Sequence, residues 1–199
     1  MQRSAFLIFI ISLLTLGSSV AEDNVEKSRE QLLSFFAGEW VSRALYAVTK
    51  LEIPDHLEHE PKSIDDLAAL SGSHPEMLRR IMNLLSCFGF FKEIAPGIFD
   101  HTESTRLLMK SHPDSLYHLS LFFGEEVHKA WEELVPCIQT GVPAFQISFK
   151  QPVFSYFKDN PARAHIFHMA MKEKSHAVIK TALASYDFGR FNSLCDLGG

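Results

Sequence analysis

The sequence contains few cysteines and no cluster of basic residues. Of its 199 residues only 3 are cysteines, and they are scattered without a CxxC pair. This number and spacing do not suit a disulfide framework, so we interpret Cys87, Cys137 and Cys195 as reduced thiols of the core. The formal net charge is −5, and no polybasic segment is present. The composition therefore gives no support for a surface that binds phosphate backbones.

Long hydrophobic runs are also missing, apart from one at the N-terminus. Residues 5–16 form an apolar stretch of 12 residues, with Arg3 before it and small residues after it up to Ala21. This pattern is typical of a secretory signal peptide, residues 1–21, cleaved after Ala21. The stretch is too short to span a bilayer comfortably, so we expect no stable membrane span after signal removal. A buried N-terminal helix is the alternative interpretation.

The chain does contain many apolar and aromatic residues. Apolar residues make up 46% of it, and 17 residues are phenylalanine, which indicates a core or pocket rich in aromatic rings. The first predicted helix covers residues 28–50, and Ser28 and Gln31 have the spacing of a capping box at its start. Its apolar residues, among them Leu33, Phe36 and Trp40, cover more than one side of the helix. We therefore assign these three to a dimer interface; later helices of the same chain are the alternative cover.

The next part of the sequence predicts a winged helix. Ser63 and Gly72 bracket one short helix, and Pro75 begins a second whose apolar face is Leu78, Ile81, Leu85 and Phe88. Two short strands then flank the turn 95–97. Such a unit often binds DNA, but its second helix offers only Arg79 and Arg80, and the chain is acidic. The pattern therefore favours a structural role, and we predict no nucleic-acid partner.

The second half of the chain reads as helices followed by one strand. We expect a short helix at 102–109, a longer one at 125–140, an irregular connector at 141–161 and a long helix from Pro161 to about Tyr186. His165 and His168 share a helix face, but no third ligand lies nearby, so we predict no metal site. A strand at 193–197 ends in an acid and two glycines. That ending suits a ligand close to the carboxyl end of a strand.

Several stretches resemble one family, the class I S-adenosylmethionine-dependent O-methyltransferases with an N-terminal dimerisation domain. They are YAVTKLEIPDHL, SIDDLAALSGSHPEMLRRIMNLLSCFGFF, AWEELVPCIQTGVPAF, FHMAMKEKS and YDFGRFNSLCDLGG. The resemblance runs from about Leu33 to Gly199. It implies a mainly α fold with a winged-helix dimerisation domain, a helical substrate cap and only the first strand of a Rossmann-like α/β methyltransferase domain.

The resemblance also implies roles for single residues. Phe167 and Met171 match positions that line the acceptor pocket, and Ser175 matches a position near the cofactor S-adenosylmethionine. Asp196, Gly198 and Gly199 match the start of the cofactor loop. Lys174 departs from plant members, which place histidine there, so we expect a different acceptor. Ordinary packing is the alternative role for these helix positions, since Phe167, Ala170 and Lys174 share one helix face and Met171 and Ser175 share another. The general base of the family has no counterpart in these residues, so no catalytic residue is assigned.

These expectations divide the chain into a signal peptide (1–21), a winged-helix dimerisation domain (22–110), a helical substrate-cap region (111–190) and the truncated start of the cofactor domain (191–199). The first hypothesis is part of a methyltransferase for a small hydroxylated molecule, inactive alone and unable to bind S-adenosylmethionine alone. The second is a non-catalytic module that pairs with a full-length relative, and the third is a DNA-binding protein. We expect a homodimer, or that heterodimer. The location is secreted or periplasmic if the leader is used, and otherwise cytoplasmic.

Overall fold

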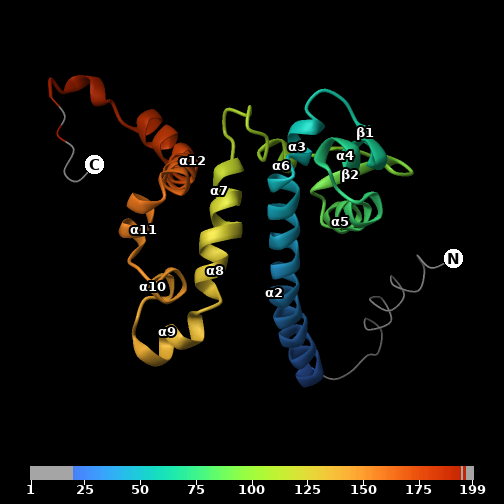
Figure 1. Cartoon of the computed structure of the whole chain (residues 1–199), viewed down its shortest axis with the longest axis horizontal. Helices are drawn as coiled ribbons and strands as arrows, with labels where there is room; N and C mark the ends of the chain where they lie inside the picture. Colours follow the sequence, from blue (N-terminus) through green and yellow to red (C-terminus); the bar gives the residue numbers. More distant parts are fainter. Residues whose placement is uncertain (1–19, 194, 196–199) are drawn as a thin grey trace. The chain divides into compact units, whose positions relative to one another are not determined.

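The computed structural model of the chain describes residues 20–193 and 195, and Figure 1 labels its elements. The chain is mainly helical, as predicted. It divides into two units, Met1–Trp40 and Val41–Gly199, and the described part of the first unit is the N-terminal portion of helix α2 (Val20–Lys50). The predicted signal peptide lies almost entirely outside the described residues. No helix within this described range is long and apolar enough to cross a membrane.

Helix α2 begins eight residues before the start that the sequence predicted. The hydroxyl of Ser28 donates to the backbone carbonyl of Asn24 at 2.8 Å, so Ser28 lies inside the helix and is not its cap. The predicted capping box is therefore wrong. Glutamate and lysine are good helix formers, and the segment around Glu26 and Lys27 continues the helix upstream. In this unit Leu33, Phe36 and Trp40 are 51%, 65% and 67% exposed.

The second unit contains the two helices and the hairpin predicted for the winged helix, together with α3 and β1, which were not predicted, and a shorter form of the helix expected at 102–109. In chain order they are α3 (Ile53–His56), β1 (Lys62–Ser63), α4 (Ile64–Ser71), α5 (Pro75–Cys87), β2 (Phe91–Ala95), β3 (Ile98–His101) and α6 (Glu103–Arg106). The hydroxyl of Ser63 caps α4 by accepting from the Asp66 amide at 3.1 Å, and Gly72 ends it with φ 65°. Both predicted helix ends are confirmed. Pro75 occupies the first turn of α5, where its missing N–H leaves no bond unmade.

The strands form one small antiparallel sheet in the order β1-β3-β2. The predicted hairpin joins β2 and β3 through Pro96 and Gly97, and Gly97 has φ 75°, which suits glycine. The amide of Gly97 donates to the Glu93 carboxylate at 2.8 Å, which closes the turn. Strand β1 adds to the free edge of β3, with Ser63 opposite Ile98. The sheet thereby covers one side of the helices α4 and α5.

An aliphatic core holds these elements together. It contains Val48 of α2, Leu67 of α4, Leu85 of α5 and the two rings Phe91 and Phe99, all almost completely buried. The predicted inner face of α5 is right for Leu78 and Leu85 but wrong for Phe88, which is 53% exposed. Phe88 follows the last helical residue, where the chain turns away. Met82 takes the inner position instead.

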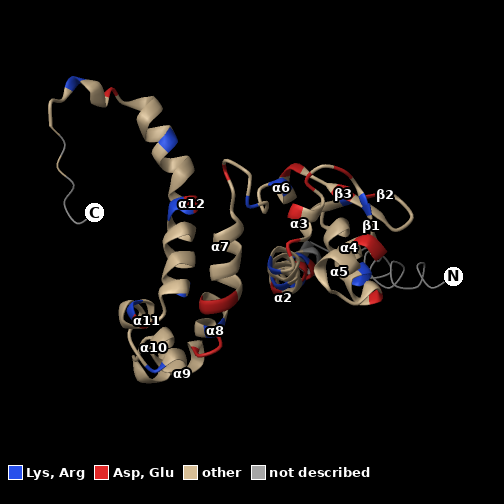
Figure 2. Ribbon diagram, turned by 45° about the horizontal axis from the view of Figure 1, so that its top comes forward, with Lys and Arg blue, Asp and Glu red and all other residues tan. Residues whose placement is uncertain are grey.

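The remaining elements form the helical cap. They are α7 (Tyr117–Phe122), the π-helical segment η1 (Phe123–Val127), α8 (His128–Trp131), α9 (Leu134–Thr140), α10 (Ala144–Phe149), α11 (Val153–Asp159), α12 (Pro161–Ser185) and the 3₁₀ turn η2 (Phe188–Arg190). Helices α7 and α12 pack side by side (Figures 1 and 2). The long helix predicted to start at Pro161 is confirmed.

Two predictions for the cap are corrected, and proline explains both. The helix predicted at 125–140 starts at Tyr117 and breaks at Glu132 and Glu133, since Pro136 cannot bond to the carbonyl one turn earlier and its ring crowds that carbonyl. The connector predicted at 141–161 contains α10 and α11, which start directly after Pro143 and Pro152. The predicted strand 193–197 lies largely outside the described residues.

Candidate functional site: the aromatic cap and its polar junction

The residues predicted to line the acceptor pocket lie on one side of α12. Arg163, Phe167, Met171 and Ser175 follow each other at intervals of four residues, so their side chains form a stripe along the helix. The first three are half-buried, and Ser175 is exposed. Phe167, Met171 and Ser175 therefore follow one another along one side of α12, while their roles toward acceptor and cofactor stay predictions. Asp196, Gly198 and Gly199 lie outside the described residues.

Phe167 belongs to a cluster of aromatic rings that four cap elements supply. Its ring stacks on Phe157 of α11 with centroids 4.6 Å apart, and meets Phe122 of α7 edge-on at 5.4 Å. Phe157 in turn contacts Phe145 of α10 at 6.2 Å and is only 6% exposed. Offset and edge-on pairs are the arrangements that ring quadrupoles favour. These ring contacts pack α7, α10, α11 and α12 against one another, and Phe167 stays half-buried among them.

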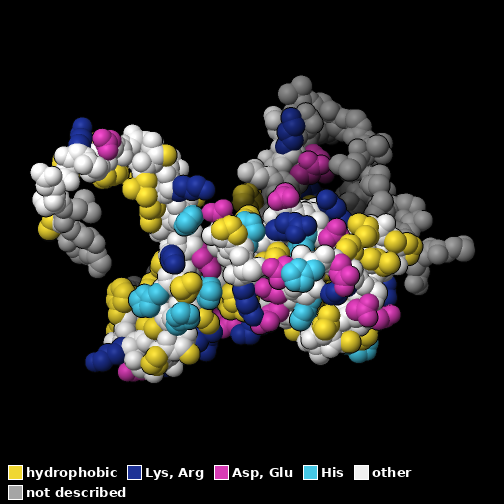
Figure 3. All heavy atoms as spheres, turned by 90° about the horizontal axis from the view of Figure 1, so that it is seen from above, with side chains coloured by type: hydrophobic (Ala, Val, Ile, Leu, Met, Phe, Trp, Pro, Cys, Tyr) yellow, Lys and Arg dark blue, Asp and Glu magenta, His cyan; other side chains and the backbone are white. Residues whose placement is uncertain are grey.

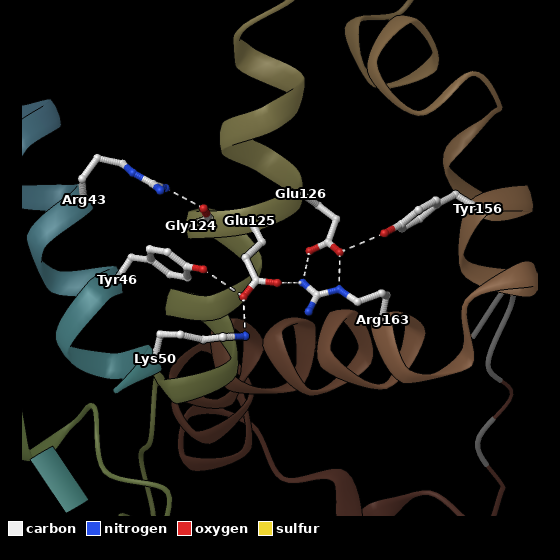
Figure 4. Close-up of polar contacts among 8 residues, drawn as sticks. All are labelled: Arg43, Tyr46, Lys50, Gly124, Glu125, Glu126, Tyr156 and Arg163. Atoms are coloured by element: carbon white, nitrogen blue, oxygen red, sulfur yellow. Dashed lines mark hydrogen bonds and ion pairs between the residues drawn. The ribbon is translucent and has the colours of Figure 1, made fainter. Parts of the chain in front are cut away.

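An acidic pair, the buried Glu126 and the partly exposed Glu125, lies in the π-helical segment η1. The carboxylate of Glu126 is 3% exposed and accepts two hydrogen bonds from the guanidinium of Arg163 and one from the Tyr156 hydroxyl at 3.3 Å. The neighbouring Glu125 accepts from Lys50 at 2.8 Å and pairs with Arg163 at 2.6 Å (Figure 4). We call Arg43, Tyr46, Lys50, Gly124, Glu125, Glu126, Tyr156 and Arg163 the polar junction. Figure 2 shows its acidic residues between α7 and α8.

The pKa values of several side chains in the polar junction are shifted by these contacts. The hydrogen bond to Glu126 raises the pKa of Arg163, and the one to Glu125 raises the pKa of Lys50. Burial opposes ionisation of Glu125, but the bond from Lys50 and the charge of Arg163 outweigh it and lower its pKa. Burial, followed by the charge of Glu126, raises the pKa of Tyr156. The junction is therefore held together by ionised side chains near neutral pH.

A close backbone approach fixes the junction to α2. A Cβ atom added to Gly124 would lie 2.0 Å from the ring of Tyr46, so only glycine fits there. The guanidinium of Arg43 donates to the Gly124 carbonyl and lies 4.7 Å from the centre of the Tyr46 ring. The hydroxyl of Tyr46 reaches Glu125 at 3.1 Å. Side chains of α2 thus contact both the backbone of η1, at Gly124, and one of its side chains, Glu125.

The far end of the stripe on α12 is fixed by Glu173. Its carboxylate, 8% exposed, accepts from the backbone amides of His118 and Leu119 at 3.2 and 2.8 Å and pairs with His118 Nδ1 at 2.7 Å. These bonds satisfy amides at the start of α7 that have no partner within the helix. Arg163 and Glu173 therefore attach α12 to α7 and η1 at two separate points.

The histidines do not form a metal site in the described part of the chain. No three histidine, cysteine or acidic side chains converge there. His165 lies edge-on to His118 at 5.9 Å, and His168 lies beside Phe167. On the face shown in Figure 3, histidines occupy several separate places.

One of the two arginines of α5 contacts the hairpin of the sheet. The guanidinium of Arg79 lies against the β2–β3 turn, where it is the nearest group to Gly97. Acidic residues lie beside the basic ones on α4 and α5 (Figure 2).

The sequence analysis did not identify the polar junction. Glu125, Glu126 and Arg163 are far apart in sequence from Tyr46 and Lys50, so their contacts depend on the fold. One signal was available, because two adjacent acids interrupt the apolar stretch LSLFFGEEVHKAW. A charge in such a stretch needs a partner when the helix is buried.

Family models match two parts of the chain. The O-methyltransferase dimerisation domain matches residues 33–111, and the O-methyltransferase domain matches residues 131–199. The chain belongs to the O-methyltransferases with an N-terminal dimerisation domain. Residues 112–130, which include α7 and η1, lie between the two matched ranges.

Two members of this family are similar to the chain over most of its length. The phenazine O-methyltransferase PhzM of Lysobacter antibioticus is 34% identical over 84% of the chain and 49% of its own length. The 8-amino-8-demethylriboflavin N,N-dimethyltransferase of Streptomyces davaonensis is 36% identical over 80% of the chain and 47% of its own length. The chain therefore spans about half the length of these relatives.

Solved structures agree with this relationship. The crystal structure of LaPhzM superposes with a TM-score of 0.77 at 33% identity, covering 80% of this chain and 48% of that one. Human N-acetylserotonin methyltransferase in complex with SAM gives 0.75 at 19% identity over 86% of this chain and 51% of that one, and shares the fold.

Proposed function

We propose that these residues form the dimerisation and acceptor-capping half of an S-adenosylmethionine-dependent methyltransferase that acts on a small fused-ring aromatic molecule. The observation that carries the proposal is the ring cluster that includes the half-buried Phe167 of α12, in a chain whose family is methyltransferase. Planar fused rings stack well on aromatic side chains. The names of two relatives support this acceptor class, since phenazine and riboflavin are both planar fused-ring compounds.

The chain's own residues would bind and orient the acceptor. Methyl transfer forms a bond from an acceptor oxygen or nitrogen to the methyl carbon as the sulfur–carbon bond breaks, and holding both ligands in line supplies much of the rate. We propose that Phe167 and Met171 contact the acceptor ring and that Ser175 lies near the cofactor. No described residue is assigned as the base that takes the acceptor's proton.

We propose that these 199 residues alone bind no S-adenosylmethionine. The family's cofactor site is built on a parallel sheet, which is stable only with neighbouring strands and covered faces. Titration calorimetry of the chain with S-adenosylmethionine should give no heat of binding. Binding at micromolar concentrations would contradict this.

A chimera tests the methyltransferase assignment. The chain would be joined to the cofactor-binding half of the Lysobacter relative and incubated with S-adenosylmethionine and phenazine or flavin acceptors. We expect release of S-adenosylhomocysteine that depends on the acceptor. A chimera that folds and binds the cofactor but methylates none of these acceptors would rule out the acceptor class. If the chain instead pairs with the intact relative and leaves its activity unchanged, it is a non-catalytic module.

We also propose that the protein is a homodimer in which α2 supplies the main contact. Leu33, Phe36 and Trp40 are exposed, and the second unit carries an apolar groove of about 240 Å³ between α2 and α5, lined mainly by Ala47, Val48, Leu51, Met77, Leu78 and Ile81. Exposed apolar side chains and an apolar groove on one chain suit a two-fold contact between copies. Obligate dimers of this kind bury on the order of 2,000 Å² or more.

Light scattering tests this dimer. Trp40→Asp should halve the mass, because it places a charge in the contact, whereas Phe154→Asp on the exposed side of the cap should not. A monomeric unmodified chain would contradict the proposal.

We propose that residues 1–21 direct export, as their composition suggests. Intact-mass measurement of secreted protein should give a chain that starts at Glu22. A full-length N-terminus in the cytoplasm would favour the alternative location.

A further inference from the structure

One carboxylate in the polar junction is shared by two helices. Oε1 of Glu125 accepts from Lys50 and Tyr46 on α2, at 2.8 and 3.1 Å, and Oε2 pairs with Arg163 on α12 at 2.6 Å. Figure 4 shows Glu125 between the two helices, with Lys50 and Arg163 approaching it from opposite sides. The position of Glu125 therefore depends on α2, and the position of Arg163 depends on Glu125.

Arg163 is held in one orientation. Its guanidinium binds Glu126 through two nitrogens while it also pairs with Glu125. A planar fork bound at two oxygens resists rotation far more than a single-point contact does. Because Glu126 is buried and also accepts from Tyr156, its carboxylate has little freedom to follow a displaced arginine.

The position of Arg163 determines that of the predicted acceptor residues. Phe167 lies one helical turn after Arg163 and Met171 two turns after it, on the same stripe. A rotation or shift of α12 at Arg163 therefore moves both side chains. Phe167 transmits the shift to Phe157 and Phe122, against which its ring packs.

The contact between η1 and α2 is rigid as well. Gly124 and the Tyr46 ring touch without space for a Cβ atom, so η1 cannot slide along α2 independently. Close-packed interiors pass small displacements on and do not absorb them. The junction thus connects α2, which carries the proposed dimer contact, to the stripe on α12.

We propose that Glu125 and Arg163 are positioning residues, through which α2 sets the placement of Phe167 and Met171 against the acceptor. This inference rests on the proposed function for the role of Phe167 and Met171. The coupling itself is a property of the described residues and is testable without methyl transfer.

Fluorine NMR of the full chain, with Phe167 replaced by 4-fluorophenylalanine, tests the coupling. Lys50→Met and Tyr46→Phe alter α2 only, remove one contact to Glu125 each, and should shift the resonance at position 167. Arg163→Met should shift it further. Lys62→Met is the matched control, because it removes a lysine–carboxylate pair of 2.7 Å with Glu60 in the neighbouring domain and should leave the resonance in place.

The outcomes separate positioning from plain stabilisation. If Lys50→Met and Tyr46→Phe lower the melting temperature but leave the resonance where Lys62→Met leaves it, the inference is wrong. In the chimera, Lys50→Met should raise the KM for the acceptor on the order of threefold to tenfold and leave that for S-adenosylmethionine unchanged. An inactive chimera would count against the proposed function, while the NMR result would still decide the coupling.

Discussion

The dimerisation domain and the cap are stabilised by different kinds of contact. In the domain, aliphatic side chains such as Val48, Leu67 and Leu85 fill the core. In the cap, aromatic rings gather around Phe157, and the buried acid Glu126 is neutralised by an arginine. An aliphatic core requires mainly the right size and spacing of residues, whereas rings and ion pairs also require defined orientations. The cap is therefore the part in which geometry is most sensitive to substitution.

The largest expected effect is on the ring at the centre of the cap. Phe157→Ala should lower the free energy of unfolding by about 3–5 kcal/mol, since it removes a buried ring that contacts several others. Urea denaturation gives the size, and hydrogen exchange should show the loss of protection in α7 and α12. The matched control is Phe154→Ala on the same helix, where the ring is 77% exposed and the change should be below about 0.5 kcal/mol. Equal effects of the two variants would contradict this description of the cap.

A large-to-small substitution in the core of the dimerisation domain should destabilise that domain and not the cap. Leu85→Ala should lower the free energy of unfolding by about 3 kcal/mol, because it opens a cavity in the aliphatic core. Protection should fall mainly in β2 and β3, with Leu70→Ala on the exposed side of α4 as control. If Leu85→Ala and Phe157→Ala each reduce protection equally in both regions, the domain and the cap unfold as one unit and the contrast between them fails.

A smaller effect is expected where the two regions touch. Gly124→Ala should lower the free energy of unfolding by about 1–3 kcal/mol, because the added methyl group meets the Tyr46 ring. A helical glycine with open space, Gly38, provides the control, and Gly38→Ala should not reduce stability. Thermal melts of both variants check this, and a neutral Gly124→Ala would show that the contact is loose.

The smallest effect concerns pH and the buried His101 of the domain. Burial, assisted by the charge of Arg106, lowers the pKa of His101 below 6.5 despite the nearby acids Asp100 and Asp55. The folded state thus favours neutral His101, so its contribution is complete above pH 6.5 and is lost as the pH falls below that value. The free energy of unfolding should decline between pH 7 and pH 5 by less than Phe157→Ala, Leu85→Ala or Gly124→Ala lowers it. The variant His101→Asn should decline less; an unchanged slope would assign the pH dependence to other groups.

The domain was largely predictable from sequence because its signals are local. Ser63, Gly72, Pro75 and Gly97 each act within a few residues, through caps, first turns and a hairpin turn. The start of α2 was missed because Ser28 and Gln31 have the spacing of a capping box. The Ser28 hydroxyl instead bonds to a carbonyl in the preceding helical turn, which the sequence does not reveal.

The cap was less predictable because its contacts are not local. The helix that carries Phe167 and Met171 could be predicted from its sequence pattern, whereas the partners of Glu125 and Glu126 come from helices some 30 to 80 residues away. Proline gave a misleading signal, since Pro143 and Pro152 read as breakers of structure yet stand at the start of helices.

The contact between Gly124 and Tyr46 restricts how these positions can change during divergence or in a mutant library. A side chain at 124 becomes tolerable only if the ring at 46 shrinks, so the two positions should drift as a pair and not independently. Selection for folded variants from a library randomised at both should recover glycine with tyrosine, or a small residue at 46 with alanine or serine at 124.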